Sequence, residues 1–243
     1  MRLDKFLANE NIGSRKAVGL LVRSGAVTVN GQAVRKADLQ IDAQADCVCV
    51  NGTPVRYNAH VYIMLHKPAG VLTATRDSRA QTVLDLLPPA MRRRGLFPAG
   101  RLDKDTTGLL ILTDDGDYAH RMLAPKSHVI KRYEAALDMP ADGADQARFA
   151  AGIQSGDDCF APARLEICEA DPHIVWVEIR EGKFHQVKRM FRACGKNVTA
   201  LKRLSIGALP LDAALRPGEA RVLSEKEAML VFAGKAEQIR RKE

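Results

Sequence analysis

The 243-residue sequence lacks long apolar runs. Those it has, such as residues 109–112 and 174–177, fall far short of the roughly 20 residues that span a bilayer. It also shows no charged-then-apolar leader at its start. We therefore expect a cytoplasmic protein, with no membrane among its partners.

Cysteine is scarce and has no pairing pattern. An odd number of cysteines without any C-x-x-C pair argues against a disulfide framework and against a zinc knuckle. We expect reduced thiols, mostly buried, at Cys47, Cys49, Cys159, Cys168 and Cys194. A G-x-x-x-x-G-K-[ST] loop is also missing, which argues against a machine driven by nucleoside triphosphates.

Positive charge is plentiful and unevenly distributed. The formal net charge is +8 and the sequence pI is about 9.4. Between residues 183 and 203 there is no Asp or Glu, and this segment favours a phosphate-facing surface. Its basic residues are Lys183, Lys188, Arg189, Arg192, Lys196, Lys202 and Arg203.

The first 58 residues have the pattern of a small independent module. Leu3, Phe6 and Leu7 form one apolar stripe of a short helix. Ser14 is a typical N-cap for a second helix, in which we expect Ala17, Leu20 and Leu21 to share the buried face and Gly25 to end the helix. The dipeptides at 30–31 and 51–52 are both Asn-Gly, a strong signal for tight β-hairpins.

Two short helices followed by a basic hairpin resemble the αL RNA-binding motif of a ribosomal protein and several RNA-modifying enzymes. The resemblance covers residues 1 to about 58, with MRLDKFLA, the capped SRKAV helix and VTVNGQAV as its carriers. It implies that Arg15, Lys16 and Arg23 contact RNA phosphates. The alternative is that these three side chains are simply a solvated helix face.

A second domain begins where the polar residues 56–60 give way to a strand, so we predict domains at 1–58 and 59–243. Strand-like runs alternate irregularly with short helical segments, which predicts an α+β domain with a mixed, largely antiparallel sheet. The expected strands are 61–65, 109–112, 133–137, 165–168 and 174–179, and the expected helices are 82–87, 117–124 and 185–194.

Residues 100–116, GRLDKDTTGLLILTDDG, carry the strongest chemical signal. Asp103 lies in an irregular segment directly before a predicted strand, where Thr106, Thr107 and a glycine offer hydroxyls and a flexible backbone to a ribose or base. A carboxylate placed in this way could be a nucleophile, a base or a metal ligand. It could also simply cap the turn together with Asp105.

A calcium loop is the metal site that this spacing suggests, and we reject it. Asp103, Asp105 and Asp114 match template positions, but the second half of the loop reads as a buried strand. Asp114 is also too short to replace the usual bidentate Glu. We therefore expect no metal.

The segment EGKFHQVKRMFRACG predicts an amphipathic helix. Val187, Met190, Phe191 and Cys194 recur with helical spacing on one apolar face, and Lys188 lies at the border of that face. Lys188 can therefore face a half-buried carboxylate and keep it ionised. Arg189 and Arg192 would meet solvent or RNA, although an ordinary packing helix would show the same pattern.

Together these segments carry a family resemblance. GRLDKDTTGLLILTDDG, KRYEAAL and EGKFHQVKRM, in this order behind an αL module, resemble the signature segments of pseudouridine synthases of the ribosomal small-subunit type. The resemblance implies isomerisation of a uridine in ribosomal RNA, most simply 16S RNA, without a cofactor. Large-subunit RNA, a non-catalytic assembly factor and a metal-dependent nuclease are the alternatives.

The resemblance also assigns roles to individual residues. Asp103 would be the catalytic aspartate, Tyr133 would stack on the target base, and Lys188 would be the basic partner of Asp103. Arg101 would position the flipped nucleotide. Beyond these, we expect substrate contacts from Thr106, Thr107, Arg189 and Arg192, RNA contacts from Lys183, Lys202 and Arg203, and a monomeric protein.

Overall fold

The computed structural model describes residues 1–10, 12–55, 57, 59–92, 95–156 and 158–233. The chain divides into two compact units, one comprising residues 1–61 and 88–96 and the other residues 62–87 and 97–243. The boundary predicted after residue 58 falls on a residue outside the described ones, so it stays a prediction. No helix in the described ranges is long and apolar enough to cross a membrane.

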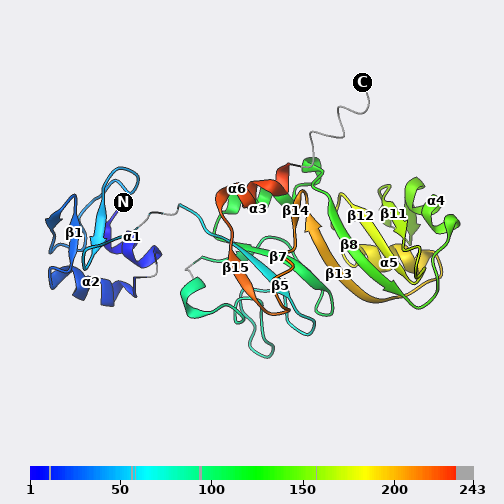
Figure 1. The fold of residues 1–243 in the computed structure, drawn as a ribbon, viewed down its shortest axis with the longest axis horizontal. Coiled ribbons are helices and arrows are strands. Elements are labelled where there is room, and N and C mark those ends of the chain that lie inside the picture. Colours follow the sequence, from blue (N-terminus) through cyan, green and yellow to red (C-terminus); the bar gives the residue numbers. More distant parts are fainter. Residues whose placement is uncertain (11, 56, 58, 93–94, 157, 234–243) are drawn as a thin grey trace, which may run out of the picture. The chain divides into compact units, whose positions relative to one another are not determined.

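The first unit pairs two helices with a four-stranded antiparallel sheet (Figure 1). The sheet order is β2-β1-β3-β4, and the Asn-Gly turns join β1 to β2 and β3 to β4. Asn30 and Gly31 both have positive φ, 51° and 80°, as a two-residue hairpin turn requires. The elements are α1 (Leu3–Asn9), α2 (Arg15–Arg23), β1 (Val27–Val29), β2 (Gln32–Ala33), β3 (Val48–Val50), β4 (Thr53–Pro54) and the 3-10 turn η1 (Pro89–Met91).

Helix α2 begins and ends as predicted but buries a different face. The Ser14 hydroxyl accepts a hydrogen bond from the Ala17 amide. Ala17 is exposed and Leu20 is 58% exposed, whereas Val18 and Val22 are buried. Apolar residues at 17–18 and 20–22 allow two stripes of helical spacing, and packing selects the one that faces the unit's own core.

The second unit is built on a nine-stranded sheet. Its order is β11-β12-β8-β13-β7-β5-β15, with β14 paired to β13 and β6 paired to β7. Every pairing is antiparallel except that of β13 with β7, so the sheet is mixed and largely antiparallel, as expected. The strands are β5 (Tyr62–Lys67), β6 (Phe97–Pro98), β7 (Thr107–Thr113), β8 (Lys131–Leu137), β11 (Arg164–Ile167), β12 (Ile174–Ile179), β13 (Val198–Ile206), β14 (Leu209–Pro210) and β15 (Ala220–Val222).

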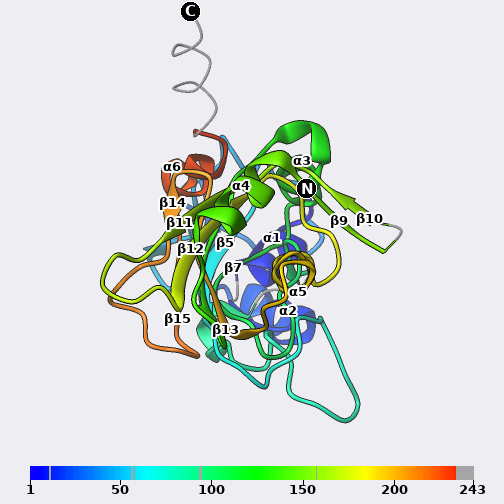
Figure 2. The same ribbon diagram turned by 90° about the vertical axis from the view of Figure 1, so that its right-hand side faces the viewer.

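Helices pack on the sheet. One core cluster joins Met64 of β5 and Ile111 of β7 to Tyr118 of α3 and Ala228 of α6. Helix α5 contacts α4 through Phe191 and Phe149, whose ring centroids are 4.7 Å apart, and Figure 2 shows α5 and the β9–β10 hairpin across the sheet from α6. These elements are α3 (Gly116–Leu123), η2 (Pro125–Ser127), α4 (Gly143–Ala151), β9 (Ile153–Ser155), β10 (Asp158–Phe160), α5 (Gln186–Ala193), α6 (Glu225–Met229) and η3 (Leu230–Phe232).

Two further expectations about this fold were wrong, and one strand was missed. Residues 82–87 form a turn, because Asp85 accepts hydrogen bonds from both the amide and the hydroxyl of Thr82. The strand β13 was missed, since its two adjacent basic residues read as surface charge. The five cysteines are free, but none of them is buried.

Candidate active site

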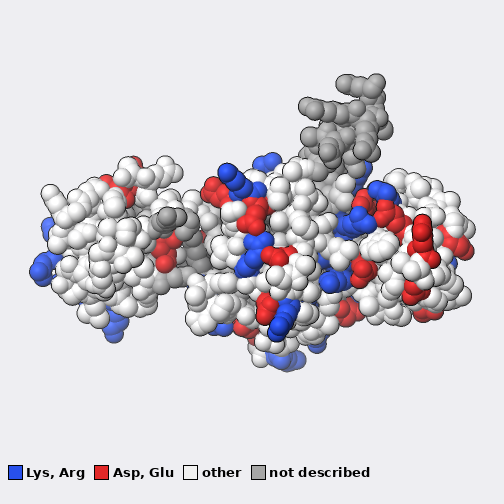
Figure 3. Space-filling model, in the orientation of Figure 1, with Lys and Arg blue, Asp and Glu red and all other residues white. Residues whose placement is uncertain are grey.

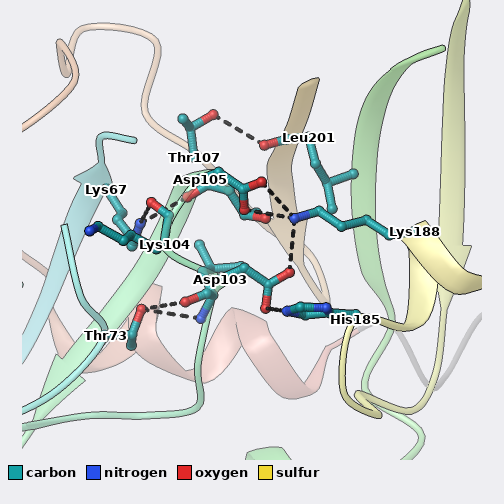
Figure 4. Close-up of polar contacts among 11 residues, drawn as sticks. Lys67, Thr73, Asp103, Lys104, Asp105, Thr107, His185, Lys188 and Leu201 are labelled. Atoms are coloured by element: carbon teal, nitrogen blue, oxygen red, sulfur yellow. Dashed lines mark hydrogen bonds and ion pairs between the residues drawn. The ribbon is translucent and has the colours of Figure 1, made fainter. Parts of the chain in front are cut away.

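The loop of residues 103–106, directly before β7, is held in place by a buried lysine. The Lys67 ammonium donates hydrogen bonds to the backbone carbonyls of Pro68, Lys104 and Thr106, at 3.0, 3.2 and 2.9 Å. Lys67 is completely buried, and this burial lowers its pKa to about 8. Two of these carbonyls, those of Lys104 and Thr106, belong to the loop, so the buried cation fixes the backbone path of the loop (Figure 4).

The residue before the loop is tied to a second segment of the chain. The Thr73 hydroxyl donates to the Leu102 carbonyl at 2.7 Å and accepts from the Leu102 amide at 3.3 Å. Sequence reasoning missed both Thr73 and Lys67. The Lys-Pro-Ala-Gly run at 67–70 is the only local signal, and it does not reveal a contact with residues almost forty positions away.

The Asp103 carboxylate faces two basic side chains from the α5 region. The Lys188 ammonium lies 3.3 Å from Asp103 Oδ2, and His185 Nε2 lies 3.5 Å from Oδ1 (Figure 4). The structure thus brings together the carboxylate and the lysine that sequence analysis paired. His185 was missed; it precedes α5 in a left-handed conformation, with φ of 50°.

Asp105 is the tighter partner of Lys188. The Lys188 ammonium donates to both Asp105 oxygens, at 2.6 and 2.9 Å, and this bonding lowers the pKa of Asp105. Lys188 therefore bridges two carboxylates of one loop. The alternative in which both carboxylates only cap a turn does not fit, because each contacts a side chain more than eighty residues away.

Tyr133 lies in β8, buried, with its ring at the wall of a pocket next to Asp103. Its hydroxyl lies 3.5 Å from Arg203 Nη1, and Arg203 Nε donates to the Leu109 carbonyl at 2.7 Å. Arg203 is 5% exposed. The expectation that Arg203 contacts RNA is therefore wrong, because its side chain is buried and its guanidinium contacts the Leu109 carbonyl and Tyr133.

Arg189 does not face the substrate surface where we expected it. Its guanidinium pairs with Asp158 at 2.6 Å, donates to the Ser155 carbonyl at 3.0 Å and lies over the Phe160 ring. It therefore anchors α5 to the β9–β10 hairpin. A helical wheel places Arg189 away from the apolar face but cannot show which element covers that side.

Four of the seven cations in the run at 183–203 pair with acids outside it, and three of these acids are distant in sequence. Lys183 lies 3.8 Å from Glu181, Lys188 pairs with Asp105, and Lys196 lies 2.8 Å from Asp145. Figure 3 shows acidic and basic side chains interspersed over the visible face. Within the described ranges, Arg192 and Lys202 are the two members of this run outside the sheet interior that have no acidic partner.

The other expected residues take varied positions. Arg101 and Arg192 are exposed, and Lys202 is half-buried. Thr106 is buried, and its hydroxyl has no hydrogen-bond partner among the described residues, whereas the Thr107 hydroxyl donates to the Leu201 carbonyl at 3.4 Å. In the first unit, Arg15, Lys16 and Arg23 are exposed along α2.

Two adjoining hollows meet at Asp103. The inner pocket, about 70 Å³, is lined by Thr106, Tyr133 and Val187, and the outer cleft, about 570 Å³, by Thr73, Lys104 and Phe184. Both share the same junction residues: Arg101, Leu102, Asp103, Gly182, Lys183 and His185. A carboxylate with adjacent cations, at the mouth of a pocket with an aromatic wall, can act on a sugar whose base stacks inside.

These features define a class of RNA-modifying enzymes: a small helix-and-hairpin unit linked to a mixed-sheet unit with an ion-paired carboxylate at a cleft. Comparison with protein families agrees. Residues 61–193 match the RNA pseudouridylate synthase family and residues 1–47 match the S4 domain. The chain belongs to the RNA pseudouridylate synthase family.

Individual relatives align along almost the whole chain. It is 47% identical to the uncharacterized RNA pseudouridine synthase YtzG of Bacillus subtilis, over 95% of this chain and 98% of that one. It is 42% identical to ribosomal small subunit pseudouridine synthase A of Escherichia coli, over 93% and 98%. A crystal structure of a pseudouridylate synthase superposes with a TM-score of 0.65 at 36% identity, covering 95% of this chain and 99% of that one.

Proposed function

We propose that this enzyme converts one uridine of small-subunit (16S) ribosomal RNA to pseudouridine in the cytoplasm, as a monomer and without a cofactor. The observation that carries the proposal is the Asp103 carboxylate, 3.3 Å from the Lys188 ammonium at the junction of the two hollows. The choice of small-subunit RNA rests on the 42% identity to the Escherichia coli enzyme.

In the proposed reaction Asp103 acts on the ribose of the target uridine, by attack at C1′ or by removal of a ribose proton. The N1–C1′ bond breaks and uracil leaves with the electron pair. The base turns and C5 bonds to C1′; on the first route the Asp103–C1′ ester bond breaks in this step, and on the second the proton taken from the ribose returns to it. The proton on C5 is then lost while N1 gains one, so atoms and charge balance. Lys188 and His185 face the carboxylate from one side and set its direction.

The inner pocket is where we place the uracil ring, against Tyr133. Stacking there would offset the few kcal/mol needed to extrude the base. A pocket of about 70 Å³ is smaller than the few hundred Å³ of usual ligand sites, so binding must widen it. Thr106 belongs to this wall, and its buried hydroxyl has no hydrogen-bond partner among the described residues, so we expect it to bond to a polar edge of the base once the pocket widens.

Tritium release tests the function directly, because joining C1′ to C5 displaces the hydrogen on C5. RNA transcribed with 5-tritiated uridine should release one tritium per 16S molecule, and sequencing of the product should map one pseudouridine. Release from large-subunit RNA alone would replace the substrate assignment. No release from either RNA would overturn the proposed activity.

Lys188→Met should lower kcat by about 10²-fold or more, because Asp103 and Asp105 lose their shared ammonium. Arg189→Met is the matched control on the same helix; it should leave kcat within a few-fold, since Arg189 pairs with Asp158 of the hairpin. The measurement is single-turnover tritium release at saturating RNA. The reverse ranking would show that Lys188 does not serve the carboxylate.

We propose that residues 1–58 dock the RNA through the exposed cations of α2. Changing Arg15, Lys16 and Arg23 together to Ala should weaken RNA binding. The slope of log K against log salt concentration should also become shallower, by about 0.7 to 0.9 for each phosphate that is no longer neutralised. Anisotropy titrations at several salt concentrations measure this slope. An unchanged slope would show that these side chains form a solvated helix face and do not contact RNA phosphates.

A further inference from the structure

Phe184 is the most exposed large apolar side chain among the described residues, at 74%. Its ring stacks on the ring of His185, with centroids 3.8 Å apart and planes at 18°. The same His185 faces Asp103. One face of the Phe184 ring is therefore covered and oriented, while the side chain as a whole stays open to solvent.

The backbone around Phe184 is fixed rather than loose. The Gln186 side chain accepts a hydrogen bond from the Lys183 amide at 3.1 Å, and the Gln186 amide donates to the Lys183 carbonyl at 3.1 Å. The Lys183 ammonium bonds the Cys159 carbonyl at 2.7 Å. The aromatic ring is thus presented in a set position, which lowers the entropic cost of binding a flat partner on it.

Phe184 lines the outer cleft and is absent from the wall of the inner pocket. The cleft also carries the cations Arg101, Lys104 and Lys183 beside Asp77 and Asp103. Lys183 pairs with Glu181, so Arg101 and Lys104 are the cations that we expect to meet a phosphate. A flat apolar ring among cations is the combination that binds single-stranded nucleic acid, with the ring for a base and the charges for phosphate. At about 570 Å³ the cleft has room for a nucleotide.

We propose that the outer cleft binds the nucleotide next to the target uridine, with its base stacked on the Phe184 ring. This deepens the proposed function and rests on it: the target base enters the inner pocket, and the neighbouring base is held one step outside, across Asp103. Phe184 is then a positioning residue, which holds the backbone while the target ribose lies at the carboxylate.

Fluorescence tests the contact without any need for catalysis. The chain has a single Trp, Trp176, so Phe184→Trp with Trp176→Phe places one indole in the cleft. Oligouridylate should quench its emission by at least half, and polyphosphate, which has no bases, should not. Val222→Trp in the same background, at a 51% exposed position on β15, is the matched control and should not respond. Oligouridylate that binds by anisotropy without quenching would overturn the subsite.

Activity separates this proposal from the function on which it rests. Phe184→Leu keeps an apolar side chain without a ring and should raise KM for 16S RNA about 10- to 100-fold, with kcat and melting temperature little changed. Phe184→Tyr should restore KM. Equal KM for Phe184→Leu and wild type would overturn the subsite while tritium release still proves the function. Absent tritium release with quenching intact would overturn the function alone.

Discussion

Asp103→Asn should abolish pseudouridine formation, with a loss of at least about 10³-fold in single-turnover tritium release. An amide can neither attack C1′ nor take a proton from the ribose. The fold should persist, because Lys188 keeps its 2.6 Å contact with Asp105 and the loop keeps its two hydrogen bonds from Lys67. RNA affinity should therefore stay within a few-fold of the wild-type value.

Two acids serve as controls for this variant. Asp117→Asn, in the exposed first turn of α3, should leave activity unchanged. Asp105→Asn should reduce kcat by about 10-fold, which is less than the loss for Asp103→Asn. It removes one of the two carboxylates that contact Lys188 and leaves the Asp103 carboxylate in place. Full activity in Asp103→Asn, or a larger loss in Asp105→Asn, would assign the chemistry to a different carboxylate.

Sequence analysis found the elements of the site better than their environment. Asp103 and Lys188 could be paired from sequence because a helical wheel places Lys188 at the border of an apolar face. The strands at 109–112 and 174–179 were predictable from their apolar pattern. Local patterns of this kind depend on residues a few positions apart, and these are the interactions that a single sequence displays.

The basic run at 183–203 shows what sequence could not supply. Seven cations without an acid in the segment favoured a phosphate surface, yet Asp105, Asp145 and Asp158 reach it from segments distant in sequence. Arg203 is buried because β13 lies in the sheet between β8 and β7. Sequence analysis did not predict this strand, because its basic residues are typical of a surface segment. Charge along the chain predicts a surface only when folding brings no opposite charge to it.

Gly108→Ala should lower the free energy of unfolding by about 3 to 5 kcal/mol. Gly108 has φ of 102°, which a side chain disfavours, and an added Cβ would lie 2.6 Å from the Arg203 amide nitrogen and closer still to the Arg203 carbonyl oxygen. Arg203 and Gly108 are paired in register where β13 runs parallel to β7. Denaturant unfolding followed by circular dichroism measures the loss.

Gly116→Ala is the matched control, because nothing lies within 4 Å of its added Cβ at the start of α3. It should leave stability within about 0.5 kcal/mol of the wild type. Gly108→Ala should also lose activity at temperatures where it is still folded, since β7 follows the Asp103 loop directly and Arg203 contacts Tyr133. We expect the close approach of β13 to β7 to hold Tyr133 in position relative to Asp103. Equal stability and activity of Gly108→Ala and Gly116→Ala would contradict this expectation.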